Sequence, residues 1–526
     1  MAATYTNGLY NGTSVTCQYT IPSHLLAFTE YTYLVLFFKC AVAKTIGEHP
    51  LCQVGIIQAK TKKPSWVLLP DFDVTTLVEW HVVRREEDRI DHLAVLKHQL
   101  DTKFSSIESQ PGWRVTVTHV HGTNVLNVFF VFNHVNFDGQ SGKIFHEGLL
   151  RNLNHLSNSE TPLTGMSTMV STAATASNMP PPVESMAHFP ISPLYAIPTL
   201  WKKLAPPFLR SRTTIPPQHA WPPIIANCPV ETDLKVVVIP KSVVEGALAA
   251  CRARNTTMTA LLHALTVVSL TLQLPESEMS AMQSVTTIDL RRHIPKMPPV
   301  APGNTELDSR KTMANIVGRL THRFDPSTIS NIRANNSYVS RIITPGKLSD
   351  KVTREILFLG VEDIMWSVAA KVRSEIQQRL NMRLRNNELG MMRFADDFRG
   401  LVKGTLNRPR VCTFLISNLV LIDGDPADTP TSSTQPVGQD GPTRGRTTSD
   451  EGISKWTINR AGFTLSAHVN GAGIHLGVIT VKGGDMVIDM TWQKGVVDDK
   501  VCEQLGEDLR TWLGHIATQA TEAPTP

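Results

Sequence analysis

The sequence predicts a mixed α/β (α+β) fold built in two halves. The chain has 526 residues, which is enough for one large two-lobed unit. Short apolar runs with strand-like alternation are interleaved with longer segments of helical periodicity. The two halves share a coarse order of strands and helices, although no short repeat is present. These observations together favour two lobes of similar architecture.

Strands and helices are expected to alternate through the first half. The most apolar window, residues 33–43, is interrupted by Lys39 and is too short to span a bilayer. It therefore predicts a buried helix, with an interfacial helix at a membrane surface as the alternative. The expected elements are a strand over 13–21, a helix over 28–46, a hairpin over 52–58 and 65–70, a helix over 90–106, a hairpin over 113–120 and 124–133, and a helix after Gly139.

Composition divides the chain into an N-terminal lobe over 1–185, a proline-rich crossover over 186–230 and a C-terminal lobe over 231–526. Within the last, residues 423–452 have almost no apolar side chains, so a disordered insertion is expected there. The predicted elements of this lobe are a strand over 234–240, helices over 242–254 and 259–274, strands over 284–292, 472–481 and 486–492, and a closing helix over 498–517.

Charge and cysteine content exclude several classes of protein. The net charge of +5 comes without any Lys/Arg run interleaved with aromatics, so nucleic-acid binding is not expected. The seven cysteines are scattered and form no C-x-x-C pair, which favours a reducing cytosol over a disulfide framework. The N-terminus lacks the charged and apolar regions of a signal peptide. A cytoplasmic protein without a transmembrane segment is expected.

The stretch "VFNHVNFDGQSG" over 131–142 carries the main chemical signal. An apolar strand ends at His134, and Asp138 and Gly139 follow four residues later. An imidazole can accept a proton at neutral pH and release it moments later, as a general base must. Gly139 accepts backbone angles that other residues resist. The plainer alternative is a turn histidine followed by Asp138 capping the next helix.

Other candidate sites are weaker. His119 and His121 alternate on one strand and could mimic a zinc triad with His134, but nothing supplies supporting ligands, so no metal site is expected. The "GQSG" segment lacks the G-x-S-x-G spacing of a nucleophile elbow. His263, on an apolar helix, is expected to be a core histidine.

The segment "FFVFNHVNFDGQSGKIFHEGLLRNL" resembles the H-x-x-x-D-G region of the CoA-dependent acyltransferase superfamily. That group includes chloramphenicol acetyltransferases, plant BAHD enzymes, peptide-synthetase condensation domains and fungal alcohol O-acetyltransferases. The fungal branch is the most similar, with further motifs in the same order over roughly residues 14–515. The D-F-G-W-G signature of the plant branch is missing, and Asn133 stands where many relatives carry a second histidine. The further matching segments are "TTMTALLHAL", "VTTIDLRRHIP", "FLISNL" and "GGDMVIDMTWQKGVVDD".

The resemblance implies a fold and a role for each site residue. It implies two chloramphenicol-acetyltransferase-like lobes, each a mixed sheet flanked by helices, with the active-site tunnel between them. His134 resembles the general base and Asp138 the residue that orients the active-site loop. Relatives pair that aspartate with a distant arginine, which Arg291 matches; the alternative for Arg291 is a surface cation. Ser417 and Asn418 match polar groups near the acyl carbonyl, as candidate oxyanion contacts or as buried turn residues.

The function implied is an acyl-CoA-dependent O-acyltransferase with no bound cofactor. Acetyl-CoA would be the cosubstrate, and the acceptor would be a hydroxyl of a small hydrophobic alcohol or secondary metabolite. The acceptor would attack the thioester directly, without an acyl-enzyme. The alternatives are a condensation or product-releasing acyltransferase that uses a carrier protein, and a non-catalytic binding protein on the same scaffold. A monomer is expected, cytoplasmic or peripheral to a membrane or lipid surface.

Overall fold

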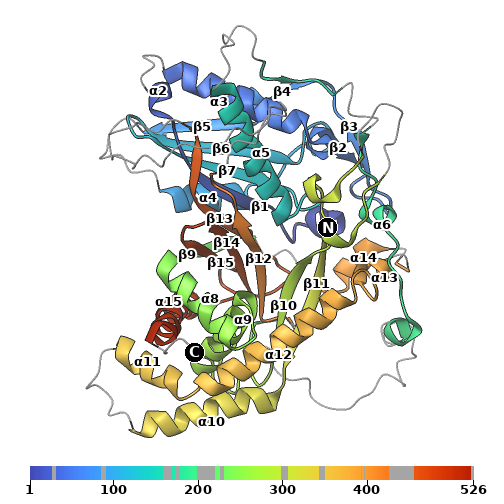
Figure 1. The fold of residues 1–526 in the computed structure, drawn as a ribbon. Helices are drawn as coiled ribbons and strands as arrows, with labels where there is room; N and C mark the ends of the chain where they lie inside the picture. Colours follow the sequence, from blue (N-terminus) through green and yellow to red (C-terminus); the bar gives the residue numbers. More distant parts are fainter. Residues whose placement is uncertain are drawn as a thin grey trace, which may run out of the picture.

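Two lobes, each built on a mixed β-sheet, make up the protein (Figure 1). A computed structural model describes the residues 1–26, 31–83, 91–157, 167–172, 178–197, 220–225, 230–297, 306–342, 350–392, 394–395, 397–410, 412–425 and 455–522. The chain end marked N in Figure 1 lies between the two lobes, beside α1 (Ala2–Thr6). The expected α/β architecture is therefore present.

The first sheet has five strands. Adjacent strands run antiparallel, except that β5 and β6 are parallel. Two helices, α3 (Tyr31–Gly47) and α5 (Gly139–Ser157), pack against each other over one face of the sheet (Figure 1). On the other face, Phe129 and Val131 pack against α4 (His92–Asp101). In spatial order the strands are β13 (Thr457–Leu465), β1 (Thr13–Thr20), β7 (Val125–Phe132), β6 (Trp113–Val120) and β5 (Val78–Val83).

Strand β13 comes from the C-terminal part of the chain but completes the first sheet. It pairs antiparallel with β1 from Thr13↔Leu465 to Thr20↔Thr457. Figure 1 shows it rising from the second lobe beside β1. The sequence pattern did not anticipate this exchange, because a strand's own residues do not specify the strand that it pairs with.

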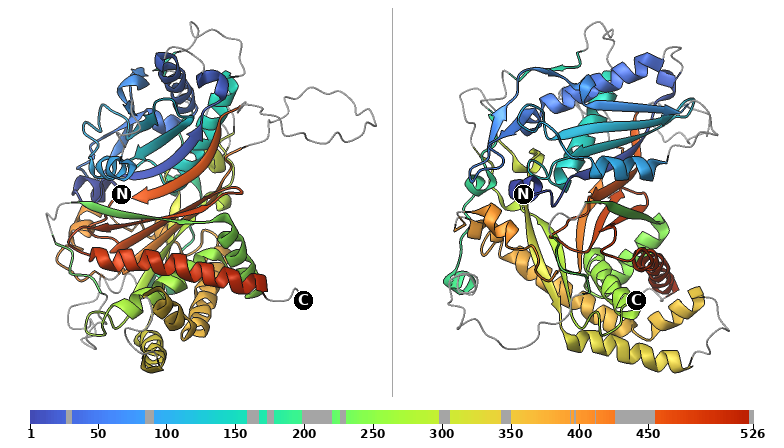
Figure 2. Two further views of the ribbon diagram at one scale, coloured as in Figure 1. Left: turned by 90° about the vertical axis from the view of Figure 1, so that its left-hand side faces the viewer. Right: turned by 180° about the vertical axis from the view of Figure 1, so that it is seen from behind.

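The second sheet has six strands and a thick helical cover. Helices α8 (Lys241–Ala253), α9 (Met258–Gln273) and α15 (Asp499–Glu522) bury one face of the sheet, and α12 (Glu362–Asn381) packs on α9. Figure 2 shows α15 running along this lobe. In spatial order the strands are β11 (Val317–Phe324), β10 (Met282–Asp289), β12 (Phe414–Ile422), β14 (Ile474–Val481), β15 (Met486–Gln493) and β9 (Thr232–Ile239).

Most elements predicted from sequence are present. Both predicted hairpins form, as the antiparallel pairs β2–β3 and β6–β7. The apolar window of residues 33–43 lies in α3, and Phe37, Phe38 and Val42 belong to the core, so the predicted buried helix is confirmed. The remaining elements are β2 (Val54–Ile57), β3 (Ser65–Leu68), β4 (Phe72–Asp73), β8 (Met169–Val170), α2 (Ser23–Leu26), α6 (Val183–Met186), α10 (Pro326–Ile342), α11 (Asp350–Leu359), α13 (Glu388–Met392) and α14 (Phe398–Lys403).

Two segments singled out in the sequence fall largely outside the described residues. Of the predicted crossover over 186–230, the structure describes 186–197, 220–225 and 230. Of the predicted insertion over 423–452, it describes 423–425. Within the described chain, no single helix has both the length and the apolar character needed to cross a membrane; α8 and α9 pass that test only as a pair bent by 97°.

Candidate active site

His134 lies at the start of a tight turn that follows β7. The strand is apolar on both faces, with Phe130 and Phe132 buried on one face and Phe129 and Val131 buried on the other. The backbone N–H of Asn133 still donates to the carbonyl of Gly112 at 2.8 Å. The side-chain oxygen of Asn133 then accepts the N–H of Val135 at 3.0 Å, the hydrogen bond that makes asparagine a turn former. The chain therefore turns sharply, and His134 is left partly exposed.

The His134 ring is held in one tautomer. Its Nδ1 lies 2.7 Å from the carbonyl oxygen of Phe137. A carbonyl only accepts hydrogen bonds, so Nδ1 carries the proton and Nε2 keeps the lone pair. The side-chain amide of Asn315 donates to the backbone carbonyl of His134 at 2.6 Å and fixes the turn from the second lobe. Burial lowers the pKa of His134 below 6.5, so the ring is neutral at pH 7.

Asp138 and Arg291 form a buried ion pair between the lobes. The Nη1 and Nη2 atoms of Arg291 donate to Oδ2 and Oδ1 of Asp138 at 2.8 and 2.9 Å. Both side chains are at most 5% exposed. Arg291 also donates to Asp289 at 3.1 Å and to the carbonyl of Ala314 at 2.6 Å. Arg291 is therefore not the surface cation of the alternative interpretation.

The same carboxylate begins helix α5. Oδ1 of Asp138 accepts the N–H and the hydroxyl of Ser141 at 2.9 and 3.0 Å, and Oδ2 accepts the N–H of Ile316 at 2.8 Å. Burial by itself raises the pKa of Asp138, but the charge and hydrogen bonds of Arg291 outweigh it and the net shift is downward. No hydrogen bond joins Asp138 to His134 within the described chain. The capping role and the arginine pair thus coexist, and Asp138 is placed to hold the turn.

Gly139 is required for a reason other than the one that the sequence suggested. Its φ is not in the left-handed region, so the expectation of an unusual backbone angle is wrong. The constraint is space: a Cβ here would lie 2.7 Å from Cζ of Phe463 and 2.8 Å from Cδ2 of Leu419. One turn later, a Cβ on Gly142 would lie 2.8 Å from Cβ of Val15. The first turn of α5 therefore lies directly on β12, β13 and β1.

Ser417 and Asn418 lie on β12 with their polar atoms already engaged. The Oγ of Ser417 is 2.7 Å from Oγ1 of Thr287. The amide of Asn418 donates to Oγ1 of Thr259 at 3.1 Å, and its oxygen accepts the N–H of Val420 at 2.8 Å. Among the described residues, neither side chain is hydrogen-bonded to His134. Their role as oxyanion contacts stays a prediction.

Three residues near the site were missed from sequence: Tyr10, Asn315 and His468. The Tyr10 ring is buried between two imidazoles, with its centroid 5.9 Å from His134 and 5.0 Å from His468. The three residues stand in loops far from His134 along the chain. None of them belongs to a periodic pattern or a recognisable motif, so only the fold could have revealed them.

The two other histidines considered for a metal site have a different role. His119 has its Nδ1 2.7 Å from the hydroxyl of Tyr31 and its Nε2 2.9 Å from the carbonyl oxygen of Thr123. His121 lies beside the same tyrosine, with ring centroids 5.4 Å apart. In the portion of the chain that the structure covers, no group of three His, Cys, Asp or Glu residues could hold a metal ion.

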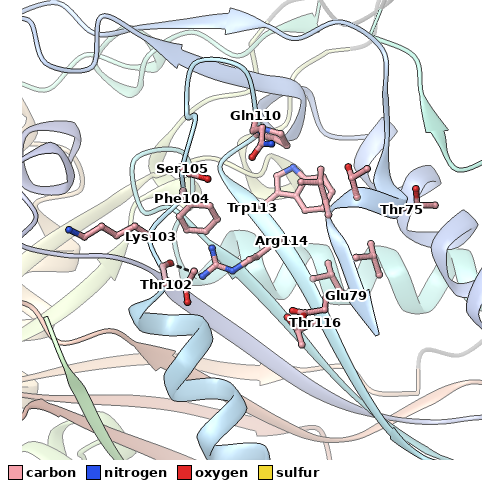
Figure 3. Close-up of a pocket in the computed structure, with 15 residues that line it drawn as sticks. Thr75, Glu79, Thr102, Lys103, Phe104, Ser105, Gln110, Trp113, Arg114 and Thr116 are labelled. Carbon is pink, nitrogen blue, oxygen red and sulfur yellow. Dashed lines mark hydrogen bonds between the residues drawn. The ribbon is translucent and has the colours of Figure 1, made fainter. Parts of the chain in front are cut away.

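Neither of two cavities in the described part of the protein is lined by His134. The smaller, about 500 Å³, lies over β5 and β6 of the first lobe (Figure 3). Its Arg114 is held by the carbonyl of Thr102 at 2.8 Å and stacks on Phe104, with 4.4 Å to the ring centroid. None of the predicted site residues lines it. The larger, about 930 Å³, lies on the second sheet and includes His468.

A family model and two similar proteins all carry the description alcohol acetyltransferase. Residues 96–304, which include His134, Asp138 and Arg291, match the family model described as alcohol acetyltransferase. The chain is 24% identical over 523 residues to a probable alcohol acetyltransferase, FCK4, of Fusarium pseudograminearum, covering 97% of this chain and 92% of that protein. It is 20% identical to the probable alcohol acetyltransferase crmB of Aspergillus fumigatus, covering 95% and 94%.

Solved structures share the fold over almost the whole chain. The trichothecene 15-O-acetyltransferase TRI3 of Fusarium sporotrichioides superposes with a TM-score of 0.64 at 12% identity, covering 98% of this chain and 93% of that one. The condensation domain of the Monacolin K polyketide synthase MokA superposes with a TM-score of 0.54 at 10% identity, covering 99% and 96%. At these identities the likeness concerns the fold alone.

Proposed function

We propose that the chain is an acyltransferase of the alcohol acetyltransferase type and that it transfers an acetyl group from acetyl-CoA to the hydroxyl of a small acceptor, with His134 as the general base; the family model and the two similar acetyltransferases support the reaction class. The observation that carries the proposal is the fixed tautomer of His134. With Nδ1 donating to Phe137, the lone pair of Nε2 is free to receive a proton.

Each bond change in the proposed reaction follows from that geometry. Nε2 takes the proton of the acceptor hydroxyl while the oxygen attacks the thioester carbonyl carbon. The tetrahedral intermediate collapses by breaking the carbon–sulfur bond, and the leaving thiolate takes the proton from the imidazolium. The carbonyl of Phe137 stabilises that imidazolium through the Nδ1 proton. The Asp138–Arg291 pair holds the turn, so that reactants bound between the lobes meet in line.

The direct test is an assay of free thiol release. Purified protein is mixed with acetyl-CoA and a panel of alcohols and amines, and mass spectrometry identifies the acetylated product. We expect thiol release that requires an alcohol and a matching O-acetyl ester. Amine products alone would show N-acylation instead.

The same assay separates the alternatives. Release from an acetylated carrier protein, but not from acetyl-CoA, would favour the carrier-dependent transferase. Absence of transfer from either donor, with tight binding of an acceptor, would favour a non-catalytic binding protein. The His134→Ala variant, run in parallel, shows whether any observed transfer depends on this site.

A further inference from the structure

Residues 2–12 run between the two lobes as a strap, beside the chain end marked N in Figure 1. Two hydrogen bonds tie this strap to the first lobe. The hydroxyl of Tyr5 donates to the carbonyl of Phe104 at 2.8 Å, and the amide of Asn11 donates to the carbonyl of Asp101 at 2.9 Å. Both acceptors lie at or just beyond the end of α4, so the strap is anchored beside that helix.

The second lobe holds the same strap from the other side. Nη1 of Arg399 on α14 donates to Oγ1 of Thr6 at 3.1 Å, and the backbone N–H of Val469 donates to the carbonyl of Leu9 at 2.9 Å. The side chain of Leu9 is 4% exposed and packs with Ile224 and Val469. Because both lobes bind it, the strap has a fixed position between them.

The ring of Tyr10 on this strap is enclosed and oriented. It is 2% exposed, and its hydroxyl is hydrogen-bonded to Oγ1 of Thr13 at the start of β1. Its centroid lies 5.9 Å from that of His134, with the two planes tilted by 54°, and 5.0 Å from that of His468. Both separations are typical of interacting aromatic pairs, which lie about 4.5–7 Å apart. The ring therefore cannot turn away from His134 without losing these contacts.

The imidazole of His134 needs such a second support. Its Nδ1 is held by the carbonyl of Phe137 at 2.7 Å, but a single hydrogen bond leaves the ring free to tilt. A catalytic group must stay within about 0.5 Å and about 10–20° of its productive geometry. Packing of the Tyr10 ring against the imidazole restricts that tilt.

Tyr10 also keeps water from part of the imidazole. Burial lowers the pKa of His134 below 6.5 and outweighs the charge of Asp138, which by itself raises it. His468, the other imidazole against Tyr10, is neutral at pH 7 because burial lowers its pKa well below 6.5. His468 therefore adds no charge here, and removal of the Tyr10 ring would expose His134 mainly to water.

We propose that Tyr10 is a positioning residue for His134, and that the strap over residues 2–12 belongs to the active site because it places this ring. The inference rests on the proposed role of His134 as the general base. Tyr10 acts through the imidazole: its ring limits the tilt of His134 and shields it from water, while Nε2 keeps its lone pair for the acceptor.

The kinetic test compares Tyr10→Ala with Tyr10→Phe in the thiol-release assay. We expect Tyr10→Ala to lower kcat about 10- to 100-fold, the effect of a misplaced catalytic group, and to leave the KM of acetyl-CoA unchanged. Tyr10→Phe keeps the ring and should retain most of the kcat. The matched control is Leu9→Ala, which truncates a buried neighbour on the same strap that packs against Ile224 and Val469.

Three kinetic outcomes would overturn the role of the ring. Wild-type kcat in Tyr10→Ala would show that His134 does not need it. A loss in Leu9→Ala as large as that in Tyr10→Ala would assign the effect to the strap as a whole. An equal loss in Tyr10→Phe would assign it to the hydroxyl. Circular dichroism checks that each variant is folded, and Tyr10→Leu, which also lacks the ring, replaces an unfolded Tyr10→Ala.

A titration of His134 tests the same placement without any turnover. The protein carries ¹³C-labelled histidine, and the NMR signal of His134 is identified by its loss in His134→Ala. We expect Tyr10→Ala to raise the pKa of His134 toward 6.5, because water replaces the ring, and Tyr10→Phe and Leu9→Ala to leave it unchanged. An unchanged pKa in Tyr10→Ala would overturn the inference even if acetyl transfer is observed. Absence of acetyl transfer by the wild type would instead refute the proposed function, and the titration would still decide where the ring acts.

Discussion

The imidazole of His134 has its Nδ1 committed to the carbonyl of Phe137, 2.7 Å away, so Nε2 alone can accept a proton. Replacing the ring removes the base but leaves the turn, which Asn133 and Asn315 hold through backbone atoms. We therefore expect His134→Ala to lower kcat by on the order of 10²–10⁴ while acetyl-CoA affinity persists. Thiol release and calorimetry measure the two quantities, with the exposed His155→Ala as control. Turnover near that of the wild type would rule out this base.

The pH dependence follows from the same ring. Burial lowers the pKa of His134 below 6.5, and the protonated ring cannot accept another proton. Activity should therefore fall as the pH drops through a value below 6.5 and stay level above it. A profile of kcat/KM against pH, limited to the range where circular dichroism shows the protein folded, measures this. A limb that still rises between pH 7 and 8 would contradict the assignment.

The Asp138–Arg291 pair is predicted to act on stability as well as activity. Removing one partner leaves a buried, unpaired charge, so Asp138→Asn should cost about 3–5 kcal/mol of unfolding free energy. The pKa of Asp138 is lowered in the folded protein, so this stabilisation is present above the unfolded value of about 3.9 and is lost as the pH falls through the folded value. Urea unfolding at pH 7 measures the loss, beside the exposed Glu245→Gln.

A double-mutant cycle separates the energy of the Asp138–Arg291 ion pair from that of the other contacts that each side chain makes. Asp138→Asn, Arg291→Gln and the double variant are compared by the same unfolding assay. Each single change breaks the same ion pair. The double variant should therefore lose less unfolding free energy than the sum of the losses in the two single variants. Strict additivity would show that the ion pair contributes nothing of its own.

The position of α5 depends on two glycines in its first turn, where a larger side chain would not fit. Its first turn touches β1, β12 and β13 through Gly139 and Gly142. Gly142→Ala should therefore destabilise the fold by about 1–3 kcal/mol, because the added methyl meets Val15 within a packed core. Gly514→Ala in α15 is the matched control, since nothing lies within 4 Å of its added Cβ and alanine favours a helix. Thermal unfolding should lower Tm for the first and not for the second.

Over the whole molecule, the described cysteines offer no activated nucleophile. Cys412 lines the larger cavity, but burial raises its pKa to about 12, so its thiol stays protonated at neutral pH. We therefore predict that both substrates are bound before chemistry, so that initial-rate plots intersect as for a ternary complex. Mass spectrometry after mixing with acetyl-CoA alone should find no acetyl adduct. Parallel plots with a burst of CoA in the absence of acceptor would point to an acyl-enzyme.

Much of this protein was determined by local sequence. The hairpin of β6 and β7, the helix α3 and the helix α5 all follow from apolar periodicity, which depends only on near neighbours. His134 and Asp138 were found because their spacing within one turn is itself the motif. His263 was predicted as a core histidine, and it is completely buried, with its ring bonded to Thr286 at 2.7 Å.

The tertiary structure alone decided how distant segments complete the site. It placed β13 beside β1, seated Asn315 on the turn of His134, and put His468 and Tyr10 between that turn and an arginine-lined cavity. It also showed that Gly139 serves close packing rather than an unusual φ. None of this is written in local periodicity, because strand partners, contact distances and the electrostatic surroundings of a side chain depend on residues hundreds of positions away, which only folding brings together.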